Sequence, residues 1–166
     1  MTDKVFNTLG ASNHSTKKRM ENDFYSTPSN ATLELLKREQ FNGSILECAC
    51  GTGAISKVLK ENIDNEVISK DLIDRNYGEA GIDFLNETEV YDNIITNPPF
   101  NLAVEFVQKA LELSNNKVAF LMRIQFLEGK KRKLLFDKSP PSRVYVFSYR
   151  LPYLRATWNI CYVCMG

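Results

Sequence analysis

The sequence is poor in residues that characterise several protein classes: its 166 residues include one histidine, one tryptophan and four cysteines. Four cysteines are too few for the disulfide framework of a small secreted domain, so we expect a reducing, cytoplasmic environment. No apolar run approaches the ~20 residues of a membrane span, and the first residues show no signal-peptide pattern. We therefore expect neither a membrane protein nor a disulfide scaffold, a collagen or a coiled coil.

The composition is that of one globular domain, with 43% hydrophobic and 25% charged residues. At about 100–200 residues per domain, the length leaves no room for a second one. Residues 1–22 are polar and lack hydrophobic periodicity, so we expect a mobile arm there. The rest shows no internal repeat and no linker rich in proline or glycine, which predicts a single domain over residues 23–166.

Acidic and basic residues gather in different parts of the chain, although the net charge is only +1. Residues 61–92 carry ten acids against two bases, and residues 130–155 carry eight bases against one acid. Such a molecule could hold a cationic small molecule on one side and a polyanion on the other. Chance segregation of solvated charges explains the same pattern more simply, so charge alone assigns no function.

The order of the expected elements is that of an α/β fold. Short apolar runs alternate with helical patterns, which indicates βαβ units and a mainly parallel sheet. The last two strands have no room for a helical crossover between them, so we expect that pair to be antiparallel. Strands are expected at residues 44–47, 66–69, 91–96, 117–122, 143–148 and 158–164, and helices at residues 32–38, 54–62, 102–114 and 127–136.

A glycine-rich turn, ending in Gly51-Thr52-Gly53, follows the strand that contains Glu47. Its glycines allow the backbone to turn tightly and to approach a ligand. The turn lacks the third glycine of the dinucleotide fingerprint and the Gly-Lys-Ser/Thr of a phosphate loop. Glu47 is a poor neighbour for a phosphate and a good one for an ammonium or sulfonium group. In isolation, a plain strand-to-helix turn would look the same.

Acidic residues also follow at later strand ends. Asp71 lies about twenty residues beyond the turn, where a carboxylate can accept hydrogen bonds from ribose hydroxyls. Asp83 and Phe84 follow the next apolar stretch, where an acid and a ring could meet an adenine. Because the carboxyl ends of parallel strands lie at one edge of a sheet, these residues together predict a site for an adenosine.

The strongest signal is Asn97-Pro98-Pro99-Phe100, at the end of the strand expected at residues 91–96. Two consecutive prolines continue neither a sheet nor a helix interior, and they remove backbone donors. The Asn97 side-chain oxygen and the Pro98 carbonyl can accept both hydrogens of a planar amino group, and Phe100 can stack on its ring. Holding the hydrogens out of the ring plane restores the nitrogen lone pair. The structural alternative is a sharp turn with a buried phenylalanine.

The four cysteines are spaced as two pairs that could form a zinc site, Cys48 with Cys50 and Cys161 with Cys164. Such a site would require the two pairs to meet, and the first pair flanks the glycine turn. We favour apolar packing and expect no metal.

In this order, the motifs resemble class I S-adenosylmethionine-dependent methyltransferases of the amino-methylating, N6-adenine type. That family holds the target amine with an Asn/Asp/Ser-Pro-Pro-Phe/Tyr motif, which implies Asn97, Pro98 and Phe100 as catalytic residues. Residues 24–28 resemble the family's upstream element, which packs over the methionine end of the cofactor. The resemblance implies a Rossmann-like sheet with helices on both faces and an antiparallel edge pair. It also implies S-adenosylmethionine held by Phe24, Tyr25, Thr27, Pro28, Glu47, Ala49, Cys50, Gly51, Gly53, Asp71, Leu72, Asp83, Phe84 and Asn97.

The segment from Arg123 to Gly129, with the basic run after it, is similar to compact phage-encoded members of that family. The implied reaction is direct methyl transfer to an adenine that has left the DNA stack, in the cytoplasm of the host if the protein is phage-encoded. No segment of the size of a target-recognition domain is inserted, which puts sequence-specific reading of DNA in doubt. Phosphate contacts are expected from the basic run, unless it is simply a solvated helix face: Lys130, Lys131, Arg132 and Lys133.

Two alternatives stay open at this point. The same cofactor could serve another acceptor, such as adenine in RNA, cytosine or a protein glutamine. The chain could instead be a catalytically silent module that binds S-adenosylmethionine or nucleic acid. The sequence predicts no oligomeric state.

Overall fold

The computed structural model describes residues 26–148, 151–153, 156–158 and 160–166. The arm expected at residues 1–22 lies outside these residues, as do Phe24 and Tyr25. The helices are α1 (Ser29–Leu36), α2 (Ala54–Asn62), α3 (Ala103–Leu113) and α4 (Lys130–Lys138), with 3-10 turns η2 (Phe84–Asn86), η3 (Phe100–Leu102) and η4 (Ile124–Leu127). The strands are β1 (Ile45–Glu47), β2 (Val67–Asp71), β3 (Glu79–Ala80), β4 (Tyr91–Thr96), β5 (Ser114–Arg123), β6 (Arg143–Val146), β7 (Leu151–Tyr153), β8 (Ala156–Trp158) and β9 (Ile160–Met165).

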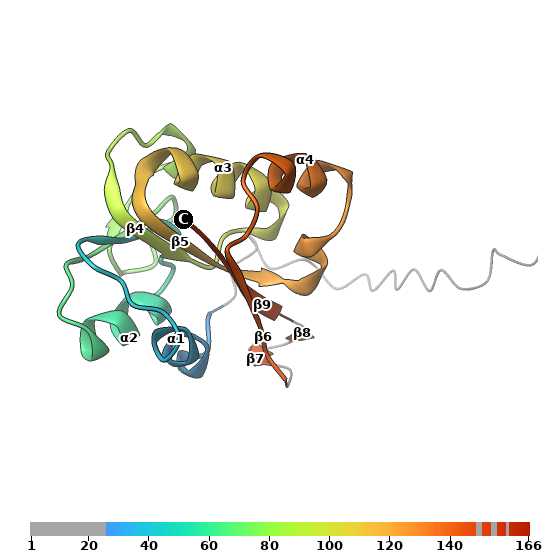
Figure 1. Ribbon diagram of the computed structural model, residues 1–166. Helices are drawn as coiled ribbons and strands as arrows, with labels where there is room; N and C mark the ends of the chain where they lie inside the picture. Colours follow the sequence, from blue (N-terminus) through green and yellow to red (C-terminus); the bar gives the residue numbers. More distant parts are fainter. Residues whose placement is uncertain (1–25, 149–150, 154–155, 159) are drawn as a thin grey trace, which may run out of the picture.

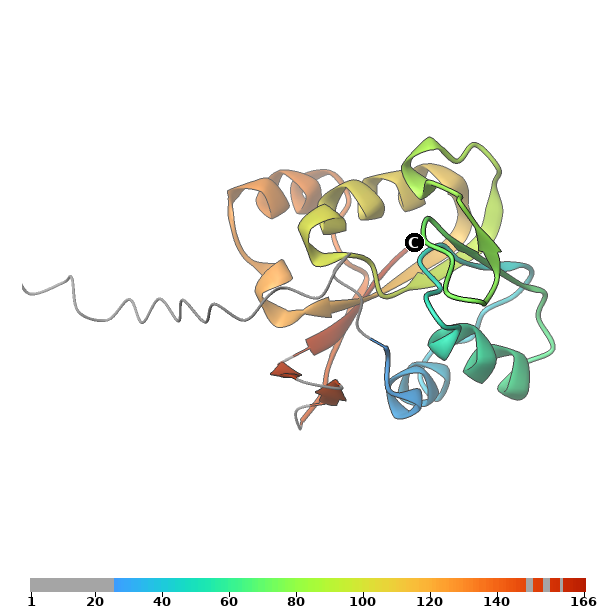
Figure 2. The same cartoon turned by 180° about the vertical axis from the view of Figure 1, so that it is seen from behind.

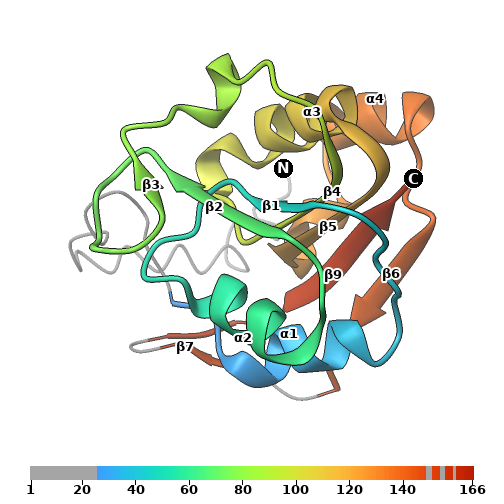
Figure 3. The same cartoon turned by 90° about the vertical axis from the view of Figure 1, so that its left-hand side faces the viewer.

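Within the described residues, seven strands form one sheet in the order β3-β2-β1-β4-β5-β9-β6 (Figures 1 and 3). The strands from β3 to β5 pair in parallel with their neighbours. β9 runs antiparallel to both β5 and β6, which confirms the mostly parallel sheet with an antiparallel pair at one edge. The carboxyl ends of β2, β1, β4 and β5 therefore lie along the same edge, where α/β folds bind ligands.

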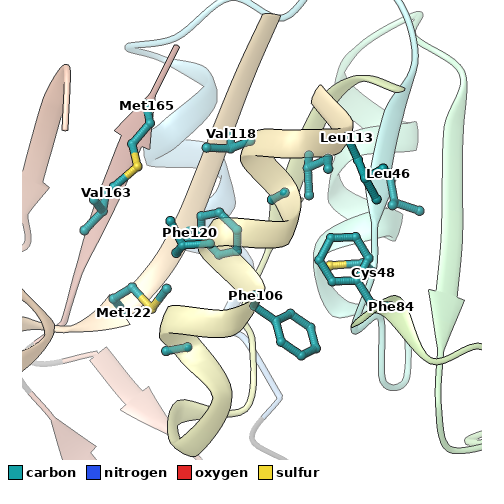
Figure 4. Close-up of a cluster of buried hydrophobic side chains, with 14 of the residues drawn as sticks. Leu46, Cys48, Phe84, Phe106, Leu113, Val118, Phe120, Met122, Val163 and Met165 are labelled. Carbon is teal, nitrogen blue, oxygen red and sulfur yellow. The ribbon is translucent and has the colours of Figure 1, made fainter. Parts of the chain in front are cut away.

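Helices cover both faces of the sheet, as predicted (Figure 2). Successive strand residues point to opposite faces, so Ile45 packs with α1 and α2 and Leu46 packs with α3. Figure 4 shows the second of these layers, in which Phe120 and Met122 of β5 lie against α3 beside Val163 of β9. Each such fully buried apolar side chain stabilises the fold by roughly 1.5–3 kcal/mol. Every helix in the described ranges is too short or too polar to cross a membrane.

Most expected elements form, with shifted ends. The first helix begins at Ser29, one residue after Pro28, whose carbonyl accepts a hydrogen bond from the Ala31 N–H at 3.0 Å. The expected helix at 127–136 begins only at Lys130, because a 3-10 turn occupies the start of that segment and Gly129 follows with φ of 99°.

The strand expected at residues 158–164 forms only from Ile160, as β9, and its expected first residue belongs to another strand. β8 ends at Trp158, and β9 begins separately at Ile160. β8 pairs with β7 in a hairpin of its own, between β6 and β9 in the chain. Apolar residues occur in both segments, so the sequence pattern alone does not reveal which strand each segment pairs with.

Candidate functional site

A cavity of about 620 Å³ lies where β1, β2 and β4 end. Residues of each motif expected to hold the cofactor or the amine line it, although they are far apart in the sequence. The first two strands and the glycine-rich turn contribute Glu47, Ala49, Cys50, Asp71 and Leu72. The loop before η2 and the segments around the prolines and α1 contribute Asp83, Phe84, Asn97, Pro98, Phe100 and Thr27.

Some predicted residues do not line this cavity. Pro28 lies at the start of α1, and Gly51 and Gly53 lie in the glycine-rich turn without lining the cavity. In the basic run, Lys131 and Arg132 line a smaller cavity beside the first one. Lys130 and Lys133 line neither of the two.

The glycine-rich turn has a conformation that requires glycine. Gly51 and Gly53 have φ of 57° and 78°, a region that L side chains rarely adopt. The Gly51 N–H donates to Asp71 Oδ2 at 2.7 Å, which ties the end of β1 to the end of β2. A Cβ on Gly53 would lie 2.4 Å from the Tyr77 ring, so any side chain there would displace that ring.

The Asp71 carboxylate, at the end of β2, contacts three neighbouring residues. Oδ2 accepts from Gly51, Oδ1 accepts from the Ile73 N–H at 2.8 Å, and Arg75 Nη1 lies 3.7 Å from Oδ1. Each carboxylate oxygen has two lone pairs, so the group can accept further hydrogens from a ligand. Asp71 is thus positioned by the backbone and still faces the cavity.

Asp83 and Phe84 form another part of the wall of the main cavity. Asp83 Oδ1 accepts from the Leu85 N–H and Oδ2 from Asn86 Nδ2, both at 3.0 Å. Phe84 is buried, and its ring centroid lies 5.1 Å from that of Phe106 on α3 (Figure 4). The pair joins η2 to α3 and gives the cavity an apolar side.

Glu47 is the most deeply buried acid of the cavity wall, with 2% of its surface exposed. Its Oε2 accepts hydrogen bonds from the backbone N–H of Ser56, at 2.8 Å, and from the Ser56 hydroxyl. Burial raises the pKa of Glu47 to about 8, although the Ser56 hydrogen bonds favour its charged form. Burial therefore favours the neutral carboxyl form, and a cation beside the group would favour the carboxylate.

The proline corner, residues 97–100, begins with Asn97, and a hydrogen bond to Thr27 sets the orientation of the Asn97 side-chain amide. Asn97 Nδ2 donates to the hydroxyl oxygen of Thr27 at 3.1 Å. Thr27 lies just before α1, 70 residues away in the chain, and is buried. Pro98 is buried, and the Pro99 carbonyl accepts from the Leu102 N–H at 3.0 Å, which closes the turn into η3. The corner is thus held from both sides.

Phe100 carries a cation on one face of its ring. The guanidinium carbon of Arg123, the last residue of β5, lies 4.4 Å from the ring centroid. This distance is within the ~6 Å of a cation–π contact. Phe100 and Arg123 line both the main cavity and the smaller one, so the two cavities adjoin at this pair.

Sequence reasoning missed Arg123 and Arg75 as residues of the cavity wall. Each basic residue stands at or just after the end of a strand that points at the site, and that position was the available signal. The parallel strand order, which turns such positions toward one edge, was needed to use it.

The cysteine pairs do not meet. Cys48 lies directly after β1, and Cys161 and Cys164 lie on β9, with β4 and β5 between them in the sheet. Cys161 and Cys164 also point to opposite faces. All four thiols are free and buried, and no group of three or more metal-ligating side chains occurs in the described part of the chain. The four-thiolate zinc alternative is therefore excluded by the strand order.

No family model and no curated protein matches the sequence. Similar folds do occur among solved structures. A protein of Pyrococcus horikoshii provisionally assigned as an RNA methyltransferase, PH1948, has a TM-score of 0.71 at 17% identity, with 90% of each chain covered.

Two further structures share the fold at lower identity. The modification subunit of a provisionally assigned type I restriction enzyme from Vibrio vulnificus YJ016 has a TM-score of 0.58 at 14% identity, covering 86% of this chain and 44% of that one. Magnesium protoporphyrin IX methyltransferase from Synechocystis PCC 6803, solved with bound S-adenosylmethionine, has a TM-score of 0.50 at 15% identity, covering 81% and 75%. Together with the strand order, these likenesses show that the chain has the Rossmann-like fold of class I methyltransferases.

Proposed function

We propose that the protein is an S-adenosylmethionine-dependent methyltransferase that methylates the N6 amino group of adenine in DNA. One observation carries the proposal: the Asn97–Phe100 corner and the residues expected to hold an adenosine line the same cavity. Its volume of about 620 Å³ lies within the ~300–1,000 Å³ of small-molecule sites.

The residues of the cavity fit the chemistry of the cofactor. The Asp71 carboxylate has lone pairs for ribose hydroxyls, and Glu47 can ionise beside an ammonium or sulfonium group. Leu72, which is 57% exposed at the cavity wall, and Phe84 offer apolar surface to an adenine ring. When bound, S-adenosylmethionine supplies a sulfonium methyl group that an amine nitrogen can displace directly.

The proline corner would orient the amine. Because Thr27 accepts the Asn97 Nδ2 hydrogen, Asn97 Oδ1 points away from Thr27. Oδ1 and the Pro98 carbonyl oxygen would then accept the two amine hydrogens and leave the nitrogen lone pair directed at the methyl group. Neither residue forms a covalent bond to the substrate, so positioning supplies the acceleration.

The surroundings of the corner favour a base of nucleic acid as the acceptor. Phe100 is partly exposed in the cavity and can stack on a planar ring, and Lys131 and Arg132 lie beyond it. The likeness to a restriction-modification subunit makes DNA the first acceptor to test, and the likeness to an RNA methyltransferase makes RNA the second.

The test is transfer of a labelled methyl group from S-adenosylmethionine to DNA, RNA and protein in parallel reactions. We expect label in DNA, recovered as N6-methyladenine after digestion to nucleosides. Asn97→Ala removes an acceptor for the amine hydrogens and should reduce transfer at least ~100-fold. Asn62→Ala, which removes an exposed amide on α2, serves as the matched control with unchanged transfer.

Each outcome decides between the alternatives. Label in DNA that survives Asn97→Ala would reject the role of Asn97. Label only in RNA or in protein would reject DNA as the acceptor. Calorimetric binding of S-adenosylmethionine without transfer to any acceptor would identify a silent binding module.

A further inference from the structure

The smaller cavity, of about 300 Å³, borders the proline corner. It shares Phe100, Asn101 and Arg123 with the main cavity and extends from them toward the start of α4. We propose that this basic groove, walled by Arg123, Gln125, Phe126, Lys131 and Arg132, holds the sugar–phosphate backbone of the strand that carries the target base. This inference rests on the proposed function, because it requires the main cavity to hold the base.

The charge of the groove suits a phosphodiester. Arg123, Lys131 and Arg132 line it, against a single acid, Glu105. A net positive, concave surface raises the local concentration of a polyanion and neutralises its phosphates.

The Arg132 guanidinium is positioned in the groove by two contacts. Its Nη2 donates to the backbone carbonyl of Gln125 at 3.2 Å, and its guanidinium carbon lies 6.0 Å from the Phe126 ring centroid. The guanidinium carries further N–H donors besides Nη2, and a phosphate oxygen is an acceptor of matching charge and geometry.

The position of the groove distinguishes a polymer from a free base. A base seated at Asn97 and Phe100 in a polynucleotide must carry its backbone out of the main cavity close to the corner. Arg123, stacked on Phe100, marks the place where the two cavities meet. A small-molecule acceptor would make no use of a second basic cavity there.

The groove also divides the basic run into two kinds of residue. Lys131 and Arg132 line it, whereas Lys130 does not and Lys133 pairs with Asp137 on the solvent side at 2.6 Å. Only part of the run is therefore assigned to phosphate contact.

The experiment measures binding of the full chain to fluorescein-labelled single-stranded 12-mers of DNA and of RNA, by fluorescence anisotropy over a salt series. Lys131→Ala should make the slope of log K against log salt less negative by about 0.7, as expected for one lost phosphate contact on a single strand. At 0.1 M salt this corresponds to about fivefold weaker binding. Lys138→Ala removes the same charge from the last turn of the same helix, outside the groove, and should change binding less than twofold.

Equal losses of affinity in Lys131→Ala and Lys138→Ala would show a diffuse basic face and overturn the proposal. It would also be overturned if Lys131→Ala bound as tightly as the wild type, or if the wild-type protein bound neither DNA nor RNA. The DNA and RNA series show which backbone is preferred. The proposed function can fail separately. If the protein binds the oligonucleotides in a Lys131-dependent way but transfers no methyl group, the groove proposal stands and the methyltransferase proposal is rejected. If Lys131→Ala leaves methyl transfer to adenine unchanged, the methyltransferase proposal stands and the groove proposal is rejected.

Discussion

At the scale of single residues, the candidate site consists of polar groups that the fold has already oriented. Asp71 and Asp83 each accept two hydrogen bonds from their own neighbourhood, and Asn97 is held by Thr27. A side chain fixed in this way loses little entropy when a ligand binds, so its hydrogen bonds contribute more fully to affinity. Glu47 differs from the others because burial has changed its protonation as well as its position.

The shifted pKa of Glu47 predicts how cofactor binding depends on pH. A bound cation favours the carboxylate, but below a pKa of about 8 the free protein must first lose the proton. The affinity for S-adenosylmethionine should therefore rise with pH by up to about tenfold per unit and level off near pH 8. Calorimetric titrations from pH 6 to pH 9 measure this dependence.

Glu47→Gln is the control for that prediction, because an amide of the same shape does not titrate in this range. Any pH dependence that remains in this variant belongs to the ligand. Parallel profiles for the variant and the wild type would show that Glu47 does not sense the bound cation.

At the scale of elements, the turn between β1 and α2 forms part of the cavity wall. Gly51 is bonded to Asp71, and Gly53 leaves space for Tyr77, whose ring also lies beneath the ammonium groups of Lys57 and Lys60. The turn therefore connects β1, β2 and α2 at the wall of the site.

Gly53→Ala tests this arrangement against a matched glycine. Gly53 and Gly81 have nearly the same φ, 78° and 79°, so alanine at either position costs about 1–2 kcal/mol of backbone strain. A Cβ at Gly81 meets nothing within 4 Å, whereas one at Gly53 must displace the Tyr77 ring. Gly53→Ala should therefore lower the free energy of unfolding more than Gly81→Ala, and it alone should weaken cofactor binding. Denaturant unfolding and calorimetry measure the two effects, and equal values for both variants would contradict the prediction.

At the scale of the whole molecule, a buried acid connects an early segment of the described chain to two late strands of the sheet. Glu39, in the connection after α1, accepts hydrogen bonds from Arg143 and Tyr145 on β6 and from Lys117 on β5. These partners lower the pKa of Glu39 to about 2 against the opposing effect of its burial. The connection before β1 is thus attached to the far edge of the sheet, where β6 would otherwise have one neighbour.

Glu39→Gln should lower the free energy of unfolding by about 1–3 kcal/mol, because the positive partners are partly exposed and water compensates them in part. In the wild type this contribution is complete above pH ~4.5, the ordinary value, and is lost as the pH falls toward 2. Denaturant unfolding between pH 3 and pH 7 measures both effects. Glu34→Gln, which breaks an exposed pair with Lys37 and Arg38, is the control and should change stability far less. A Glu39→Gln protein as stable as the wild type at pH 7 would show that the network is only a surface feature.

The sequence by itself determined the class of fold and the four motifs of the cavity. The period of the apolar residues distinguishes strands from helices, and parallel strands bring their carboxyl ends to one edge. The sequence therefore assigns Glu47, Asp71, Asp83 and Asn97 to one candidate site, because each stands at or just after the end of a strand or an apolar stretch.

Only the tertiary structure decided which side chains of the molecule contact one another. The pairing of Thr27 with Asn97, of Arg123 with Phe100 and of Glu39 with Arg143 joins residues that are 70, 23 and 104 positions apart. No local pattern encodes such pairs, because they follow from strand order and from how helices pack across it. The same holds for the pKa of Glu47, which depends on how much water the surrounding side chains exclude.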